Sequence, residues 1–264
     1  MRMRAMDTDK QEITITVCPG LNKKGIKEKF DKLVIHPGDL ISIVGPTGSG
    51  KTAFINDIEV FAQGDTVTGR RILVNGKEPS ESLIRDPSCK PIAMITQNTK
   101  CLADLTVEQF LEMHRSTRGN LSPNIVHDAI ELGNRFTGEK FSGNWRVSSL
   151  SGGQTRSLMI ADALLISDAP IILLDEIENA GIYKDEVIDT LRKMKKAVIF
   201  VTHDPYVSMI TDRRIVMCNG EVADIIEAGK TEDEAIRLVR ELDARLSDIR
   251  ERLRNGDVIK EVTV

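Results

Sequence analysis

The feature that most constrains this chain is the segment Gly45–Thr52 (GPTGSGKT), which follows the short aliphatic run Leu40–Val44. The segment fits the pattern G-x-x-x-x-G-K-[ST], in which glycines turn successive backbone N–H groups toward phosphate oxygens. The run before it is typical of a buried strand, and the pattern after Thr52 predicts a helix whose positive end adds to the phosphate site. The segment therefore predicts an α/β fold with a site for a nucleoside triphosphate.

Two residues at the end of this segment have separate expected roles. The ammonium of Lys51 supplies a mobile positive charge for the β- and γ-phosphates, and the hydroxyl of Thr52 can ligate Mg²⁺. The remaining positions contribute mainly backbone groups. The candidate nucleotide-binding residues are Gly45, Pro46, Thr47, Gly48, Ser49, Gly50, Lys51 and Thr52.

Short aliphatic runs recur along the chain and are typical of parallel strands covered on both faces. They are Ala93–Thr96, Ile171–Leu174 and Ala197–Thr202. The earlier segment Glu12–Val17 alternates polar and apolar residues, so we expect an antiparallel strand with one face in water. These runs predict a mainly parallel sheet with an additional antiparallel part.

The strand signal fades between about Asn98 and Val147. Thr106–Met113 and Pro123–Leu132 instead have the pattern of helices, separated by turns that contain glycine. We therefore expect a helical subdomain inserted into the sheet domain.

Asp175 and Glu176 follow the aliphatic run Ile171–Leu174 directly. A carboxylate at the end of a strand can hold Mg²⁺, which predicts this role for Asp175. The neighbouring Glu176 is placed to orient or deprotonate an attacking water. Two acids after an apolar run are a weak signal alone, and the glycine-rich segment upstream is what makes a functional role the favoured interpretation.

Composition narrows the classes of partner. Lys and Arg number 36 and Asp and Glu 40, so the net charge of −4 lacks the basic surplus of a nucleic-acid binder. No segment approaches the ~20 apolar residues that cross a bilayer. The four cysteines, Cys18, Cys89, Cys101 and Cys218, contain no Cys-x-x-Cys pair, which indicates reduced thiols. We expect a cytoplasmic protein with no nucleic-acid partner.

With the segment Leu150–Gln154 (LSGGQ) upstream of Ile171–Glu176, the chain resembles the ATP-binding cassette (ABC) ATPases over roughly Ile13–Ile226. Its motifs occur in the order of that family. Gln97 falls at the Q-loop glutamine and His203 at the H-switch histidine. The resemblance implies a P-loop NTPase fold of ABC type, with a mainly parallel sheet core, an N-terminal antiparallel β subdomain and an inserted helical subdomain at about 98–165.

The resemblance also implies Mg²⁺-dependent ATP hydrolysis by a head-to-tail homodimer. ATP on the glycine-rich segment of one molecule would be closed over by the signature residues of the other, which are Leu150, Ser151, Gly152, Gly153 and Gln154. Glu176 would be the catalytic base, His203 would hold the γ-phosphate and water in line, and Gln97 would contact Mg²⁺ or the water. The implied Mg²⁺ ligands are Thr52, Gln97 and Asp175.

Three departures from the family pattern leave questions open. Cys18–Ile26 holds no aromatic residue where the family places an adenine-stacking ring, so the choice between ATP and GTP is open. Ile182 occupies the position of the D-loop aspartate, which leaves communication between the two sites open. Ser157 and Asp162 replace frequent arginines. The catalytic residue types are intact, and a working ATPase is expected.

The C-terminal segment Thr231–Gly256 is the clearest helix in the sequence. Thr231 and Glu234 have the spacing of a capping box, and Gly256 suits a left-handed stop. Its apolar residues have nearly heptad spacing and are Ile236, Val239, Leu242, Leu246, Ile249 and Leu253. The pattern fits a helix packed on its own domain, or one that contacts a partner or a second copy.

The sequence thus predicts an ABC ATPase domain at 1–230 and a charged C-terminal helix and tail at 231–264. One interpretation is the nucleotide-binding subunit of a transporter, held at the inner face of the cell membrane by a separate membrane-spanning subunit. The alternative is a soluble ABC ATPase that drives assembly, maturation or remodelling of a client protein. A module that senses ATP without hydrolysis is disfavoured by Glu176 and His203.

Overall fold

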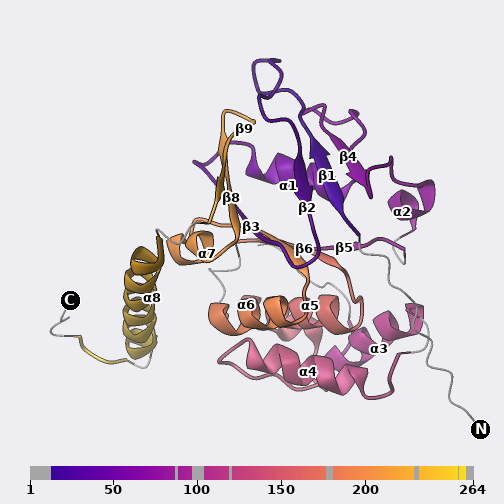
Figure 1. Cartoon of the computed structure of the whole chain (residues 1–264). Coiled ribbons are helices and arrows are strands. Elements are labelled where there is room, and N and C mark those ends of the chain that lie inside the picture. The colour runs from indigo at the N-terminus through magenta and orange to yellow at the C-terminus, as the bar shows by residue number, and fades with distance from the viewer. Residues whose placement is uncertain are drawn as a thin grey trace, which may run out of the picture.

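The computed structural model has two β-sheets above a layer of helices (Figure 1). It describes residues 13–86, 89–96, 104–118, 121–176, 181–228, 232–254 and 256–259. The smaller sheet is antiparallel and has the order β2-β1-β4. Its strands are β1 (Ile15–Cys18), β2 (Leu33–Ile35) and β4 (Arg71–Val74).

The larger sheet has six strands in the order β5-β6-β7-β3-β8-β9. Its strands are β3 (Leu40–Val44), β5 (Ile92–Ile95), β6 (Ile171–Asp175), β7 (Ala197–Val201), β8 (Arg213–Cys218) and β9 (Glu221–Glu227). All neighbouring pairs are parallel apart from the antiparallel β8–β9 pair. The four aliphatic runs predicted as buried strands are confirmed as β3, β5, β6 and β7.

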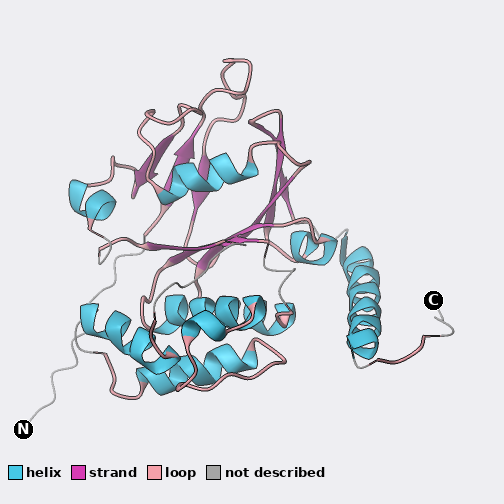
Figure 2. Ribbon diagram, turned by 180° about the vertical axis from the view of Figure 1, so that it is seen from behind, coloured by secondary structure: helices cyan, strands magenta, loops and turns pink. Residues whose placement is uncertain are grey.

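Helices cover both faces of this sheet (Figure 2). The helices are α1 (Lys51–Glu59), α2 (Glu81–Arg85), α3 (Val107–Thr117), α4 (Ile125–Arg135), α5 (Gly152–Leu165), α6 (Lys184–Lys193), α7 (Pro205–Met209) and α8 (Asp233–Arg254), with a 3₁₀ turn at Val147–Ser149. Successive residues of β6 point to opposite faces of the sheet and pack in different apolar cores. Leu173 packs with α1, whereas Leu174 packs with α5 and α6. This two-sided burial explains the continuous aliphatic runs.

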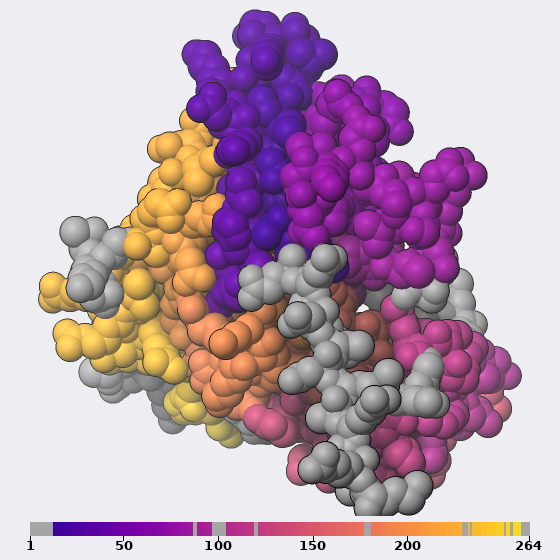
Figure 3. Space-filling model, turned by 45° about the vertical axis from the view of Figure 1, so that its right-hand side comes forward, coloured from indigo at the N-terminus to yellow at the C-terminus, as the bar shows by residue number. Residues whose placement is uncertain are grey.

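The predicted helices at Thr106–Met113 and Pro123–Leu132 correspond to α3 and α4. They form a separate apolar cluster with Leu158 of α5, while Ile160 of the same helix packs under the large sheet. Helix α5 therefore joins the helical layer to the sheet. In Figure 3 the helical layer lies below the N-terminal sheet, and the C-terminal helix lies at the side. The boundary at residue 230 stays a prediction.

The prediction that one face of the first strand lies in water is wrong. β1 is the central strand of the small sheet, and Thr16 is only 9% exposed. Its neighbours across the two flanking strands are Val34 and Leu73, whose larger side chains enclose the threonine. At Thr16 the alternating pattern therefore assigned a buried threonine to the water-facing side.

Helix α8 packs against its own chain beside α7 (Figure 1). Part of its apolar stripe nevertheless stays exposed. Leu242 and Leu253 are 43% and 57% exposed. The left-handed stop is confirmed, because Gly256 has φ of +86°. Thr231 of the predicted capping box lies outside the described residues.

Within the described residues, no helix combines the length and apolarity needed to cross a membrane. Among the described residues, Cys18, Cys89 and Cys218 form no disulfide, and Cys101 lies outside the described residues.

A buried network of ion pairs around Arg70 connects the small sheet to the large one. Arg70 is fully buried, and its guanidinium donates to both carboxylate oxygens of Glu28 at 2.9 and 2.6 Å and to Asp57 at 3.1 Å. Glu28 also accepts hydrogen bonds from the backbone N–H groups of Gly20 and Val222. One charged group thus connects α1, β9 and the loops around the small sheet.

We expect Arg70→Leu to lower the free energy of unfolding by about 3–5 kcal/mol, because it leaves buried carboxylates without their cation. The matched control is Arg71→Leu. Arg71 pairs with Glu78 on the surface, where such a pair contributes roughly 0–1 kcal/mol. Urea unfolding followed by circular dichroism measures both variants. Equal unfolding midpoints for the two would contradict the assigned role of Arg70.

Candidate functional site

The glycine-rich loop connects β3 to α1 and bends through three glycines. Gly45, Gly48 and Gly50 have φ of +145°, +76° and +104°, a region that other residues rarely adopt. A Cβ at Gly45 would also collide with the backbone carbonyl of Met217. The loop is held from outside by the β8–β9 turn, where the N–H of Gly220 donates to the carbonyl of Ser49 at 2.8 Å.

Lys51 extends back over this loop and donates to the carbonyls of Gly45 at 2.8 Å and Pro46 at 3.2 Å. Burial lowers the pKa of the Lys51 ammonium, while the carboxylates of Glu176 and Asp175 act in the opposite direction. The hydroxyl of Ser49 is buried in the same loop without a hydrogen-bond partner. The loop therefore combines a cation with an unsatisfied polar group, which suits a phosphate ligand.

Asp175 ends β6, and Glu176 follows in a left-handed conformation with φ of +50°. The N–H of Glu176 donates to the carbonyl of Val201 on β7 at 2.8 Å. A non-glycine residue in this region costs free energy, and such residues cluster at functional sites. The turn places the two carboxylates close enough to Lys51 to influence its pKa.

His203 comes from the neighbouring strand end. β7 lies between β6 and β3 in the sheet, so the turn after Val201 lies beside the turn after Asp175. The Nε2 atom of His203 is 3.8 Å from Oε1 of Glu176. Parallel strands therefore bring together residues that are far apart in the sequence.

The signature residues begin α5. The hydroxyl of Ser151 accepts from the N–H of Gln154 at 3.3 Å, and the Gln154 side chain accepts from the N–H of Ser151 at 2.9 Å. Gln154 also donates to the carbonyl of Glu139 at 3.0 Å, so its side chain is used inside the molecule. Ser151 and Gly152 are exposed. Among the described residues, no hydrogen bond or ion pair joins Leu150–Gln154 to the glycine-rich loop.

Two cations near the site were not predicted from the sequence. Arg156 donates to the carbonyl of Glu176 at 3.4 Å, and Lys23 donates to the carbonyl of Gly48 at 2.6 Å. Neither contact has a local sequence signal, since both join separate elements. Asp162, at a position where arginine is frequent, lies 3.0 Å from Nδ1 of His114 and so ties α5 to α3.

The implied Mg²⁺ fits the residues present. No group of three or more His, Cys, Asp or Glu among the described residues could hold a metal ion on its own. Mg²⁺ is usually held by one or two protein oxygens together with substrate phosphates and waters. Thr52, which follows Lys51 in α1, and Asp175, whose charge acts on the Lys51 ammonium, are donors of that kind. Gln97 lies outside the described residues.

Comparison with known proteins matches the family described as ABC transporter to residues 31–179. An uncharacterized ABC transporter ATP-binding protein of Methanocaldococcus jannaschii is 49% identical over 243 residues, covering 92% of this chain and 93% of that protein. The thiamine import ATP-binding protein ThiQ of Brucella abortus is 29% identical over 201 residues, covering 74% of this chain and 80% of its own length. The chain therefore belongs to the ABC transporter family, as an ATPase of the ATP-binding cassette type.

Solved structures agree on the fold. The ATP-binding subunit of an ABC transporter superposes with a TM-score of 0.64 at 19% identity, covering 84% of this chain and 94% of that chain. An ATP-binding cassette in a dimeric post-hydrolysis state with ADP and Pi gives a TM-score of 0.61 at 24% identity, covering 82% and 99%. The predicted fold class is thereby confirmed.

Proposed function

We propose that this chain binds ATP with Mg²⁺, hydrolyses it as a head-to-tail homodimer and energises a transporter as its nucleotide-binding subunit. The observation that carries the proposal is the meeting of three strand ends. Lys51 follows β3, Glu176 follows β6 and His203 follows β7, with 3.8 Å between the last two side chains. A cation, a base and an imidazole at one edge of a sheet suit hydrolysis of a terminal phosphate.

Each residue has a distinct task in this proposal. Lys51 and the backbone N–H groups of the glycine-rich loop bind the β- and γ-phosphates. Glu176 accepts a proton from the attacking water, and His203 Nε2 hydrogen-bonds the γ-phosphate to keep the water in line. Thr52, Asp175 and Gln97 would hold Mg²⁺, which neutralises phosphate charge when bound.

The proposed dimer supplies the signature residues to the other molecule's ATP. Ser151 and Gly152 are exposed at the N-terminus of α5, where backbone N–H groups and the helix dipole attract anions. They make no hydrogen bond to the glycine-rich loop of their own chain within the described residues. A cassette of the same fold has a dimeric structure with bound ADP and Pi, which supports this arrangement.

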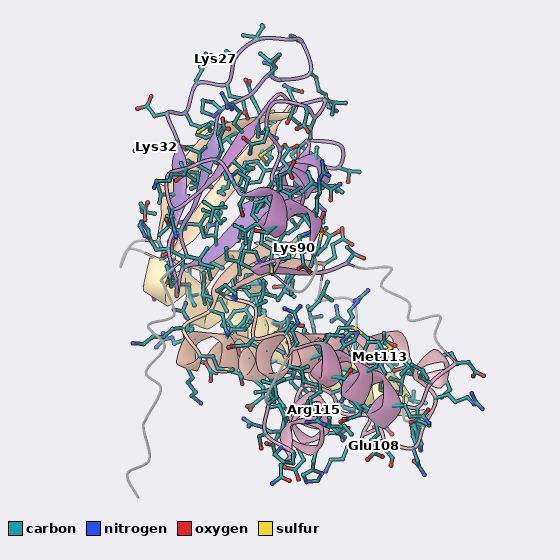
Figure 4. The ribbon with its side chains drawn as sticks, turned by 90° about the vertical axis from the view of Figure 1, so that its right-hand side faces the viewer. Lys27, Lys32, Lys90, Glu108, Met113 and Arg115 are labelled. Carbon is teal, nitrogen blue, oxygen red and sulfur yellow. The ribbon has the colours of Figure 1, made fainter. Side chains whose placement is uncertain are left out.

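The transporter role is supported by the relatives, several of which are import ATP-binding proteins for thiamine, sulfate/thiosulfate or sn-glycerol-3-phosphate. A membrane-spanning partner would place this chain at the inner face of the cell membrane. The helical layer offers exposed apolar side chains to such a partner, with Met113 on α3, labelled in Figure 4, 47% exposed. Trp145 is 45% exposed, and its carbonyl accepts from the N–H of Val107 at the start of α3.

The alternative is a soluble client protein, favoured by the exposed part of the apolar stripe of α8 and by Ile182 at the D-loop position. A pull-down from native cells with the Glu176→Gln variant and ATP separates the two. Co-purification of an integral membrane protein supports the transporter role. Recovery of a soluble enzyme in its place would favour the client, and the Lys51→Ala variant is the matched negative control.

Magnesium removal gives a direct test of the cofactor. We expect EDTA to abolish phosphate release from ATP, because without the metal the phosphate charge is no longer neutralised. Excess Mg²⁺ should restore phosphate release. A colorimetric phosphate assay at constant ionic strength measures the rate. Full turnover in EDTA would contradict a role for the metal.

A further inference from the structure

A group of charged side chains connects the C-terminal helix to the turn that carries His203. Lys184, the first residue of α6, lies 2.6 Å from Oδ2 of Asp204 and 2.7 Å from Oδ2 of Asp243 on α8. The three side chains are 13%, 11% and 25% exposed. Asp204 follows His203 directly, so the Lys184 ammonium contacts the residue next to His203 in the chain.

Asp204 makes hydrogen bonds to residues before and after it in the turn between β7 and α7. Its Oδ1 atom accepts from the N–H of Val207 at 3.1 Å, which caps α7, and its own N–H donates to the hydroxyl of Thr202 at 2.9 Å. Lys184 occupies the other carboxylate oxygen. The backbone from Thr202 to Asp204 is therefore set by contacts of the Asp204 side chain as well as by β7.

A second pair of contacts also joins α8 and α7 to the start of α6. Arg240 on α8 donates to Oδ2 of Asp185 at 3.0 Å, and the hydroxyl of Tyr206 on α7 donates to Oδ1 of the same residue. Arg240 and Asp243 are three residues apart and lie on the same face of α8. The helix thus holds two consecutive residues of α6, around a groove of about 430 Å³.

Lys184 stays charged in this setting. Burial lowers the pKa of the ammonium, but the hydrogen bonds to Asp204 and Asp243 and their negative charges together outweigh burial, and the pKa is raised. Contacts with two carboxylates restrain the position of the ammonium, and loss of either carboxylate removes one of these restraints. Asp243 is the carboxylate supplied by the C-terminal helix.

We propose that Lys184 is a positioning residue for His203, and that α8 sets its position through Asp243. The inference rests on the proposed role of His203 in hydrolysis. It gives the C-terminal helix a function in turnover: anything that lifts α8 away releases Lys184, shifts Asp204 and moves the imidazole relative to Glu176. The start of α6 also follows Ile182, so the same anchor fixes the chain just after the D-loop position.

The test compares Asp243→Asn, Asp243→Glu and Asp248→Asn in the full-length protein. Asp248 lies on the exposed side of α8, 67% exposed, and serves as the matched control for the same chemical change. We expect Asp243→Asn to lower kcat for ATP about two- to tenfold with KM unchanged, since the phosphate loop is not touched. Asp243→Glu should recover part of the rate, and Asp248→Asn should match the wild type.

A merely structural role would give a different pattern. It would lower the melting temperature and the yield of folded protein without changing kcat per folded molecule. In a Lys184→Met background, Asp243→Asn should have no further effect on kcat if the helix acts through the lysine. Wild-type kcat in Asp243→Asn, or additive losses in the double variant, would overturn the inference. Failure of the proposed function is recognised separately, because wild-type protein would then release no phosphate.

Discussion

Glu176→Gln is expected to stop ATP hydrolysis while leaving ATP binding intact. Loss of a general base typically costs about 10²- to 10⁴-fold in rate, and the amide has nearly the same shape as the carboxylate. The contacts of the Glu176 backbone, to Val201 and Arg156, do not involve the side chain that is changed. The turn should therefore keep its geometry, and the change should isolate the chemistry.

Two measurements check this result. Phosphate release gives the rate, and light scattering with ATP gives the mass, which should be that of a dimer because the closed state is no longer released by hydrolysis. Glu178→Gln is the control, because it makes the same change from carboxylate to amide two residues further along the chain. Full turnover in Glu176→Gln would remove Glu176 as the base, whatever the mass.

Lys51→Ala is expected to weaken nucleotide binding itself strongly. Charge-assisted hydrogen bonds contribute about 1.5–3 kcal/mol each, so losing the contacts to two phosphates weakens binding roughly a hundredfold or more. Lys51 also bridges the carbonyls of Gly45 and Pro46, so the loop loses an internal brace. Both effects act in the same direction.

Calorimetric titration with ATP and Mg²⁺ measures the affinity, and thermal melting verifies that the variant is folded. Lys77→Ala, an exposed lysine in the turn after β4, is the control for loss of one positive charge. A folded Lys51→Ala protein with wild-type affinity would show that the phosphate site lies elsewhere.

Much of the fold was predictable because it depends on local patterns. Aliphatic runs bounded by turns identified β3, β5, β6 and β7, and their two-sided burial is the reason that they lack alternation. The glycines of the loop have positive φ, as the pattern requires. The burial of Thr16 was not predictable, because it depends on the larger neighbours Val34 and Leu73 on other strands.

The candidate site was predictable to the extent that its residues follow strand ends. Asp175 and Glu176 were predicted from their position after an aliphatic run, and His203 from the resemblance to the ABC ATPases. The sheet order brings the side chains of Glu176 and His203 within 3.8 Å. Arg156 and Lys23 were not predicted as contacts of the site, since an arginine on a helix and a lysine in a loop have no distinguishing pattern. Their roles come from contacts with backbone carbonyls of distant segments.

The sequence by itself determined the class of fold, the phosphate loop and the family, because glycine spacing, strand composition and motif order are properties of short segments. Only the tertiary structure decided how the charged residues are paired. Arg70 is fully buried between Glu28 and Asp57, and Lys184 lies between Asp204 and Asp243. A charge can be buried only where opposite charges from distant segments converge, and that convergence is a property of the packed chain.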